Sequence, residues 1–182
     1  MKTVLRLVLV LTLTSLVAAA ALAEVYTYAQ PKIQRHKEAA LKRAIFQVLP
    51  GTQTYADTVM HGKTVYACAG PDGARIGYAI PAEGNGYQGT ISLMFGVTPD
   101  MRKVTGMSVL GHAETPGLGA KIEEASFTGK FADLNVLNGI ELVKNAPPDK
   151  ATGKVDAITG ATISSRAAVR IINAALAQVG GN

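Results

Sequence analysis

The residues with the clearest chemical potential lie in DAITGATISSR, residues 156–166. This stretch combines a carboxylate, several hydroxyl groups and a glycine, and an apolar-striped segment follows it. One or two hydroxyls are enough to cap the start of a helix. The surplus indicates that one hydroxyl has a second role, such as carrying a ligand.

The segment after this stretch has the apolar spacing of a helix over Arg166–Val179. Its apolar stripe consists of Ala168, Ile172, Ala175, Leu176 and Val179. A helix N-terminus offers free N–H groups and the positive end of the helix dipole to an anion. Thr162 places a hydroxyl where a phosphate would be held. Capping by Thr162, Ser164 or Ser165 explains the same pattern, so both interpretations remain open at this point.

A glycine turn, Gly84–Gly89, matches the spacing G-x-G-x-x-G. A dinucleotide-binding fingerprint must follow a strand and open a helix. Here the glycines run into TISLMFGVT, which has the composition of a strand, so the pattern argues against a nicotinamide site. The bare backbone around Gly86 and Tyr87 allows either another part of the chain or a flat ligand to come close.

The segment GHAETPGLGAKI, residues 111–122, predicts a tight loop. Pro116, Gly117 and Gly119 favour the turn, and Glu114 and Thr115 precede it as polar groups at a strand end. No second histidine lies at metal-ligand spacing from the one in this segment, so we expect no metal site. A loop that contacts a ligand and a plain connection between elements both fit this sequence.

The pattern Asp156-x-x-Thr159-Gly160-Ala161-Thr162 resembles the flavinylation motif of FMN-binding domains. Glu114–Gly119 resembles a second hallmark of these domains, and the turn Gly84–Gly89 resembles a third. The three motifs follow one another along the chain in the same order as in the family. The cofactor-binding residues that this resemblance implies are Asp156, Thr159, Gly160, Ala161, Thr162, Glu114, Thr115, Gly117, Leu118, Gly119, Gly86 and Tyr87.

The resemblance implies FMN joined covalently to Thr162 through its phosphate by a flavin transferase. Asp156 and Thr159 would then serve recognition by the transferase and positioning of the linkage. The flavin ring would lie against the glycine turn and the Glu114–Gly119 loop. No catalytic residue separate from the flavin is implied. Ser164 and Ser165 fall beyond the motif, and we expect them to be dispensable for attachment.

Among FMN-binding domains, the chain is most similar to the RnfG family, the G subunits of Rnf-type ion-translocating ferredoxin:NAD oxidoreductase complexes. That similarity implies an electron-carrying subunit with other membrane subunits as partners, in a complex that moves Na⁺ or H⁺. Two alternatives stay open: a flavin-carrying protein outside any ion pump, and the related C subunit of a sodium-translocating NADH:quinone reductase.

The N-terminus carries Lys2 and Arg6 and is then uncharged from Leu7 to Ala23. This run is long enough for a short membrane span. The residues before Glu24 also fit a signal-peptidase site, so a cleaved signal peptide is the alternative. In both cases the basic residues stay inside and the bulk of the chain crosses the membrane. We expect residues 1–28 to be retained as a single-pass anchor in the inner membrane, with the domain on the extracytoplasmic side.

The remaining sequence predicts an α+β fold. A linking helix is expected over residues 29–51, opened by Pro31, and an FMN-binding domain over residues 52–182, with a curved antiparallel sheet flanked by helices. Strands are expected over residues 63–69, 74–81, 89–98, 104–113 and 139–144, and the first half of 121–134 is expected to be helical. Cys68 is the single cysteine, which excludes an internal disulfide, and we expect it in a buried strand. Basic residues are scattered and tryptophan is absent, which argues against nucleic-acid binding.

Overall fold

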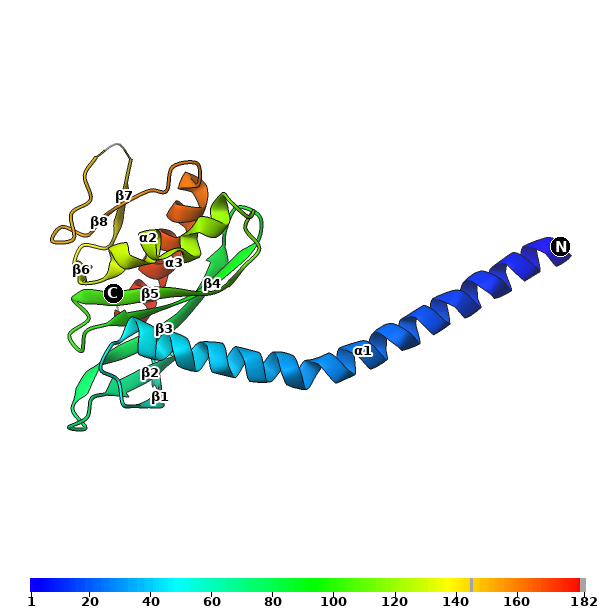
Figure 1. The fold of residues 1–182 in the computed structure, drawn as a ribbon, viewed down its shortest axis with the longest axis horizontal. Coiled ribbons are helices and arrows are strands. Elements are labelled where there is room, and N and C mark those ends of the chain that lie inside the picture. The colour runs from blue at the N-terminus through cyan, green and yellow to red at the C-terminus, as the bar shows by residue number, and fades with distance from the viewer. Residues whose placement is uncertain (145, 181–182) are drawn as a thin grey trace. The chain divides into compact units, whose positions relative to one another are not determined.

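The computed structural model describes residues 1–144 and 146–180, so residues 145, 181 and 182 of the expected domain lie outside the described part. The chain divides into two compact units, Met1–Ala40 and Leu41–Asn182. Figure 1 shows the elements, with the short 3₁₀ helices written η. In chain order they are α1 (Lys2–Val48), β1 (Thr54–Met60), β2 (Lys63–Ala69), β3 (Arg75–Asn85), β4 (Thr90–Val97), β5 (Lys103–His112), η1 (Gly119–Glu123), α2 (Ala125–Thr128), η2 (Gly129–Phe131), β6 (Leu134–Asn135), β7 (Glu141–Val143), β8 (Lys154–Asp156) and α3 (Thr162–Gly180).

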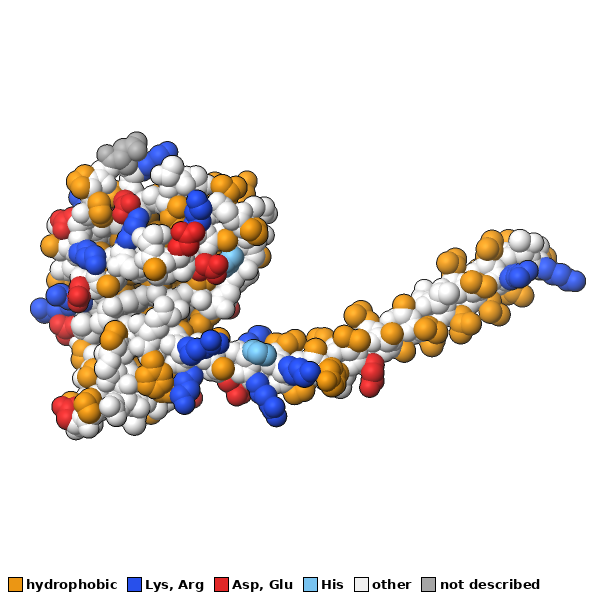
Figure 2. All heavy atoms as spheres, viewed as in Figure 1, with side chains coloured by type: hydrophobic (Ala, Val, Ile, Leu, Met, Phe, Trp, Pro, Cys, Tyr) orange, Lys and Arg blue, Asp and Glu red, His pale blue; other side chains and the backbone are white. Residues whose placement is uncertain are grey.

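Helix α1 is long and apolar enough to cross a membrane. Its most apolar stretch of 18 residues has a mean hydropathy of 2.2, and none of that stretch is buried. Apolar side chains crowd this part of the helix in Figure 2. Thr12 and Thr14 donate their hydroxyl protons to the carbonyls of Val8 and Val10, at 2.8 and 3.0 Å. These polar groups are therefore satisfied without water, as a lipid environment requires.

Pro31 does not open a second helix, which corrects the sequence-based expectation. Helix α1 is continuous from Lys2 to Val48, with Pro31 inside it. A proline removes one backbone hydrogen bond from a helix. Because helix propagation is cooperative, the regular turns on both sides keep the helix intact across that gap.

The domain is built on a six-stranded antiparallel sheet with the strand order β1-β2-β3-β4-β5-β6. Every strand pairs with its neighbours in sequence, which confirms the predicted antiparallel sheet. Strands β3 and β4 pair as far as Asn85 and Thr90. The N–H of Gly86 donates to the carbonyl of Gly89 at 2.7 Å and closes the turn between them. The glycine turn thus joins two strands, as the sequence predicted.

The two faces of the sheet bury two separate cores, because successive side chains of a strand point to opposite faces. Phe95 of β4 belongs to the larger core, which also contains the apolar stripe of α3. The neighbouring Met94 belongs to the smaller core with Ile45 and Val48 from the end of α1. Cys68 is buried in this smaller core, as expected, and burial raises the pKa of its thiol.

Helix α3 begins at Thr162 and not at Arg166, which corrects its expected start. It starts early because Ser164 and Ser165 turn inward and are buried in its first turn. A strand that the sequence did not suggest, β8, pairs in parallel with β7 and places Asp156 beside Val143. With only three residues, β8 is too short to show strand periodicity.

The segment between β5 and β6 forms the short turns η1, α2 and η2, which shortens the helix expected in the first half of residues 121–134. Phe127 and Phe131 are fully buried, and their rings meet edge to face with centroids 5.3 Å apart. These two aromatic residues fix the segment to the larger core.

Candidate functional site

Glu114, shortly after the end of β5, is buried, with 4 % of its surface exposed. Its Oε1 accepts hydrogen bonds from the backbone N–H groups of Tyr87 at 2.7 Å and Gln88 at 3.1 Å. Its Oε2 accepts the hydroxyl proton of Ser164, in the first turn of α3. One carboxylate therefore joins the glycine turn, the loop after β5 and the start of α3.

The charge of Glu114 is held by neutral donors. Burial raises the pKa of its carboxyl, but the hydrogen bonds from Ser164, Gln88 and Tyr87 outweigh burial. The net result is a pKa below the ordinary value of a glutamate. Glu114 is therefore ionised at neutral pH, and both of its oxygens are engaged in holding the segments together.

Two glycines make room for this carboxylate. A Cβ on Gly86 would lie 2.3 Å from Oε1 of Glu114. A Cβ on Gly119 would lie 2.5 Å from Oε2 of Glu114 and 2.6 Å from Oγ of Ser164. A side chain at either position would thus bring a Cβ far inside van der Waals contact with the Glu114 carboxylate, so any residue larger than glycine would displace Glu114. The chain also turns at Gly117, whose φ of +76° lies in the left-handed region that glycine favours.

The motif segment Asp156–Thr162 is fastened by backbone hydrogen bonds at the end of β8. The N–H of Ala157 donates to the carbonyl of Val143 at 3.1 Å. The N–H of Ala161 donates to the carbonyl of Ile158 at 3.0 Å, in a turn where Gly160 has a φ of +82°. This turn requires a residue that tolerates positive φ. It brings the chain directly into α3.

The buried Ser165 locks this turn to the helix. Its hydroxyl accepts the N–H of Ile158 at 3.1 Å and donates to the carbonyl of Ala161 at 3.0 Å. The hydroxyls of Ser164 and Ser165 are thus both committed to structural hydrogen bonds. They do not cap the N–H groups of α3, as the capping interpretation would require.

Thr162 differs from these two serines. It is half-buried, and its hydroxyl makes no hydrogen bond within residues 1–144 and 146–180. The first bond of α3 runs from the N–H of Ser165 to the carbonyl of Ala161. The N–H groups of Thr162, Ile163 and Ser164 therefore have no partner in the described part of the chain, and they form the positive end of the helix dipole.

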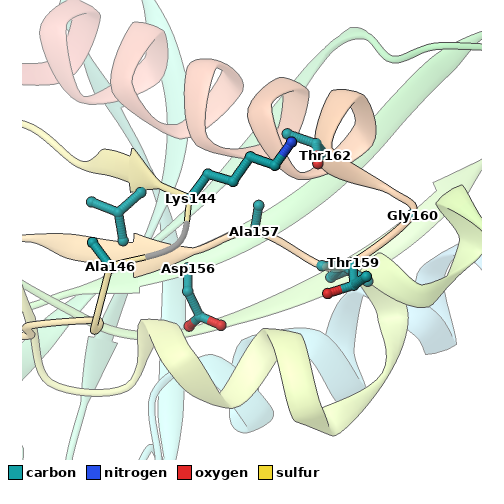
Figure 3. Close-up of a pocket in the computed structure, with 9 residues that line it drawn as sticks. Lys144, Ala146, Asp156, Ala157, Thr159, Gly160 and Thr162 are labelled. Carbon is teal, nitrogen blue, oxygen red and sulfur yellow. The ribbon is translucent and has the colours of Figure 1, made fainter.

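Two cavities meet at Thr162. One has a volume of about 460 Å³, the other about 420 Å³, and Lys144, Gly160 and Thr162 line both. The first is lined by Tyr87, Glu114, Thr115, Leu118, Gly119, Lys144, Gly160, Ala161, Thr162, Ile163 and Ser164. The second is lined by Val143, Lys144, Ala146, Asp156, Ala157, Ile158, Thr159, Gly160 and Thr162. Figure 3 shows the second cavity, with the Lys144 side chain extended toward Thr162.

The first cavity has an apolar rim. Tyr87, Leu118 and Ile163 come from the glycine turn, the Glu114–Gly119 loop and the start of α3, and each leaves more than half of its surface exposed, at 65, 53 and 54 %. Large exposed apolar side chains around a cavity are typical of a ligand or partner site. The site therefore combines an apolar opening with a polar base at the start of α3.

A family profile described as FMN-binding domain matches residues 86–177. The G subunit of the ion-translocating oxidoreductase complex of Methanosarcina acetivorans is 34 % identical over 98 % of this chain and 95 % of its own. The chain belongs to the FMN-binding domain family. Another relative in sequence is the G subunit of the proton-translocating ferredoxin:NAD⁺ oxidoreductase complex of Clostridium ljungdahlii, 35 % identical over 93 % of this chain and 88 % of its own.

Solved structures share the fold of this FMN-binding domain. The C subunit of the Na⁺-translocating NADH-quinone reductase of Parabacteroides distasonis superposes with a TM-score of 0.60 at 19 % identity, over 80 % of this chain and 92 % of its own. NqrC of Shewanella oneidensis gives a TM-score of 0.58 at 20 % identity, over 76 % of this chain and 73 % of its own.

The residues at the two cavities fit FMN. Each cavity has the volume of a small-molecule site. The free N–H groups of α3 and the Lys144 ammonium group suit a phosphate, which favours helix N-termini and cations. The apolar rim suits a flat aromatic ring, and the Thr162 hydroxyl is accessible from both cavities.

The structure brings most of the sequence-predicted residues to these cavities. Tyr87, Glu114, Thr115, Leu118, Gly119, Gly160, Ala161 and Thr162 line the first, and Asp156 and Thr159 line the second together with Gly160 and Thr162. Gly86 and Gly117 line neither of the two cavities and shape the backbone instead.

Sequence reasoning missed several residues of the site. Lys144 follows β7 directly, and a lysine at a strand end facing the motif was the available signal. Ile163 was missed because it is a single apolar residue beside the motif. Lys130 was missed because its contact with Asp156, a 2.7 Å ion pair, joins distant parts of the sequence.

Proposed function

We propose that this protein is the flavin-carrying electron-transfer subunit of a membrane-bound, Rnf-type ion-translocating oxidoreductase complex, with FMN joined to Thr162 by a phosphoester bond. The observation that carries the proposal is the convergence of three motif segments on one cavity lined by Thr162, whose hydroxyl has no hydrogen bond to any residue that the structure describes. The hydroxyls of the neighbouring Ser164 and Ser165 are occupied by structural hydrogen bonds, which favours Thr162 as the acceptor.

Attachment requires a donor in which the FMN phosphate carries a leaving group, supplied by the flavin transferase. The Thr162 oxygen forms the new O–P bond, the bond from phosphorus to the leaving group breaks, and the hydroxyl proton is lost to base. The product is a phosphodiester, which keeps one negative charge. The N–H groups of the first turn of α3 and the ammonium group of Lys144 would stabilise that charge.

FMN supplies the redox chemistry when it is bound. The chain holds and orients it. Tyr87, Leu118 and Ile163 give the ring an apolar setting, and Glu114 keeps their three segments in register. A covalent link suits a carrier that cycles electrons without releasing its cofactor.

The membrane assignment rests on α1 and on the relatives in sequence, which are subunits of ion-translocating complexes. We propose that α1 is retained as a single-pass anchor and that other membrane subunits of such a complex are its partners. Lys2 and Arg6 precede the apolar run, which favours the extracytoplasmic side for the domain.

The attachment is tested by producing the full chain in a host that contains the flavin transferase. Intact-mass measurement should show an increase that matches FMN, and in-gel fluorescence should persist after denaturation. Thr162→Ala should remove the fluorescence completely, whereas Thr162→Ser should keep part of it because a hydroxyl remains. Ser164→Ala and Ser165→Ala should keep covalent flavin in their folded fraction. Parental fluorescence in Thr162→Ala would show that the attachment residue is wrong.

Topology and partners are tested on membranes. Protease added outside the inner membrane of spheroplasts should degrade the domain, while protection would place it inside. The full chain should co-purify with integral membrane subunits. Recovery as a soluble protein without residues 1–23 would instead support a flavin carrier outside any ion pump.

A further inference from the structure

Lys130 joins the core of the domain to the motif segment. Its Nζ lies 2.7 Å from Oδ2 of Asp156 and donates a second hydrogen bond to the Asp156 backbone carbonyl at 3.2 Å. One ammonium group therefore holds both the side chain and the main chain of the first residue of the motif. Its position resists displacement because Phe127 and Phe131, on either side in the sequence, are fully buried.

The geometry points to Lys130 as a positioning residue for the acceptor Thr162, which it serves through Asp156. This inference rests on the proposed attachment of FMN to Thr162. It also assigns Asp156 a role inside the domain, in place of a direct contact with the flavin transferase.

In the described part of the chain, the pairing of Asp156 with Val143 between β8 and β7 is supplemented by contacts at three successive residues of the motif segment. Lys130 holds Asp156, the Val143 carbonyl holds Ala157, and the Ser165 hydroxyl holds Ile158. The contact between Val143 and Ala157 joins two backbone groups, and the contact from Ser165 comes from α3 itself. Lys130 is the charged side chain among these contacts, and it comes from the segment whose Phe127 and Phe131 lie in the larger core.

The shielding of the Lys130–Asp156 pair favours this role. The Asp156 side chain is 37 % exposed and that of Lys130 is 25 % exposed, so the pair is partly protected from water. A charge-assisted bond in such a setting is stronger than a fully exposed one. The carboxylate and the backbone carbonyl of Asp156 are both engaged inside the domain, which favours a positioning role over a docking contact with another protein.

The experiment compares attachment in Lys130→Met, Lys130→Arg and Lys150→Met, using the full chain and the flavin transferase. Lys130→Met keeps an unbranched side chain of similar length and removes the ammonium group, which lies 5.8 Å from the centroid of the Phe127 ring. Lys150 is the matched control, because its ammonium group binds backbone carbonyls on both sides of Lys130, those of Gly129 at 3.5 Å and Ala132 at 2.7 Å, and neither acceptor belongs to the motif. The readout is the initial rate of covalent flavin incorporation per folded chain.

We expect Lys130→Met to slow incorporation about tenfold, which corresponds to about 1.4 kcal/mol. Lys130→Arg should restore most of the rate, and Lys150→Met should match the parent. Asp156→Asn should slow incorporation by a similar factor. The double variant, with Lys130→Met and Asp156→Asn together, should incorporate flavin no more slowly than either single variant, since each substitution removes the same contact.

Amide hydrogen exchange separates positioning from general loss of stability. In Lys130→Met, the amides of Ala157, Ile158 and Ala161 should exchange faster while those of β4 remain at parental rates. Faster exchange throughout the domain would overturn the inference. So would parental incorporation in Lys130→Met together with slow incorporation in Asp156→Asn, because Asp156 would then act on the transferase directly. If the parent itself acquires no flavin, the proposed function fails instead.

Discussion

The Glu114 loop (Glu114–Gly119) and the motif segment (Asp156–Thr162) reach the same cavities but hold their acids in opposite ways. Glu114 is buried and bound by neutral donors, two backbone N–H groups and one hydroxyl. Asp156 is partly exposed and bound by a lysine. A buried acid with neutral donors gives rigid geometry, whereas a partly exposed ion pair gives a more adjustable one, since water and salt reach it to some extent.

This difference matches the tasks proposed for the two regions. The Glu114 loop would provide a fixed surface for the flavin ring. The motif segment would have to admit a transferase and present Thr162 to it, which requires a segment that opens at low cost. Substitutions and solution conditions should therefore affect the two regions unequally.

The largest effect on stability is expected from Glu114→Ala. It leaves the N–H groups of Tyr87 and Gln88 and the Ser164 hydroxyl without their acceptor, so the free energy of unfolding should fall by about 2–4 kcal/mol. Urea unfolding of the detergent-solubilised chain, followed by tyrosine fluorescence, measures it. Glu83→Ala, at an exposed position of β3, is the control and should change stability by less than about 0.5 kcal/mol. Equal stability of the two variants would contradict the scaffold role of Glu114.

A smaller loss is expected from Gly119→Ala, because its Cβ would collide with Glu114 and Ser164. The cost of such overpacking is about 1–3 kcal/mol. Gly111→Ala provides the matched control, since nothing lies within 4 Å of a Cβ at that position. The same unfolding measurement should leave Gly111→Ala close to the parent. If the two alanine variants have the same free energy of unfolding, the close packing of Gly119 against Glu114 does not contribute to stability.

The pH dependence of stability should single out Glu114. Its pKa in the folded chain lies below the ordinary value, which is about 4.3 for a glutamate in an unfolded chain. Its contribution is therefore complete above that pH and is lost as the pH falls through the folded-state pKa. Between pH 7 and pH 3.5, the parent should lose more stability than Glu114→Gln, which cannot titrate at this position. Parallel losses in the two proteins would show that Glu114 does not supply this dependence.

The smallest effect is expected from salt, and only in the motif segment. The Lys130–Asp156 pair is partly exposed, so 1 M NaCl should weaken it by about 0.2–1 kcal/mol. Amide exchange at Ala157 should accelerate up to a few-fold, while exchange at Tyr87 and Gln88 stays constant because Glu114 is buried. Salt sensitivity at Tyr87 equal to that at Ala157 would remove the distinction between the two regions.

The sequence alone determined the elements with strong local signals. Alternation of apolar residues marked strands β2 to β5, and the glycines between β3 and β4 marked their turn. The long apolar run marked the part of α1 that is apolar enough to cross a membrane, although not the continuity of the helix past Pro31. The order of the three motif segments identified the family, because each motif keeps a fixed local spacing.

Tertiary structure alone decided how the site is held together. Ser164 and Glu114 lie 50 positions apart in the chain, and Lys130 and Asp156 lie 26 apart. No local spacing encodes such pairs, since they depend on how the helix, the loop and the small parallel sheet pack on the larger core. The same packing turned Ser164 and Ser165 inward and left the Thr162 hydroxyl without a hydrogen bond to the rest of the described chain. Local patterns thus supplied a set of candidate hydroxyls, and burial distinguished among them, because a hydroxyl taken out of water needs a partner.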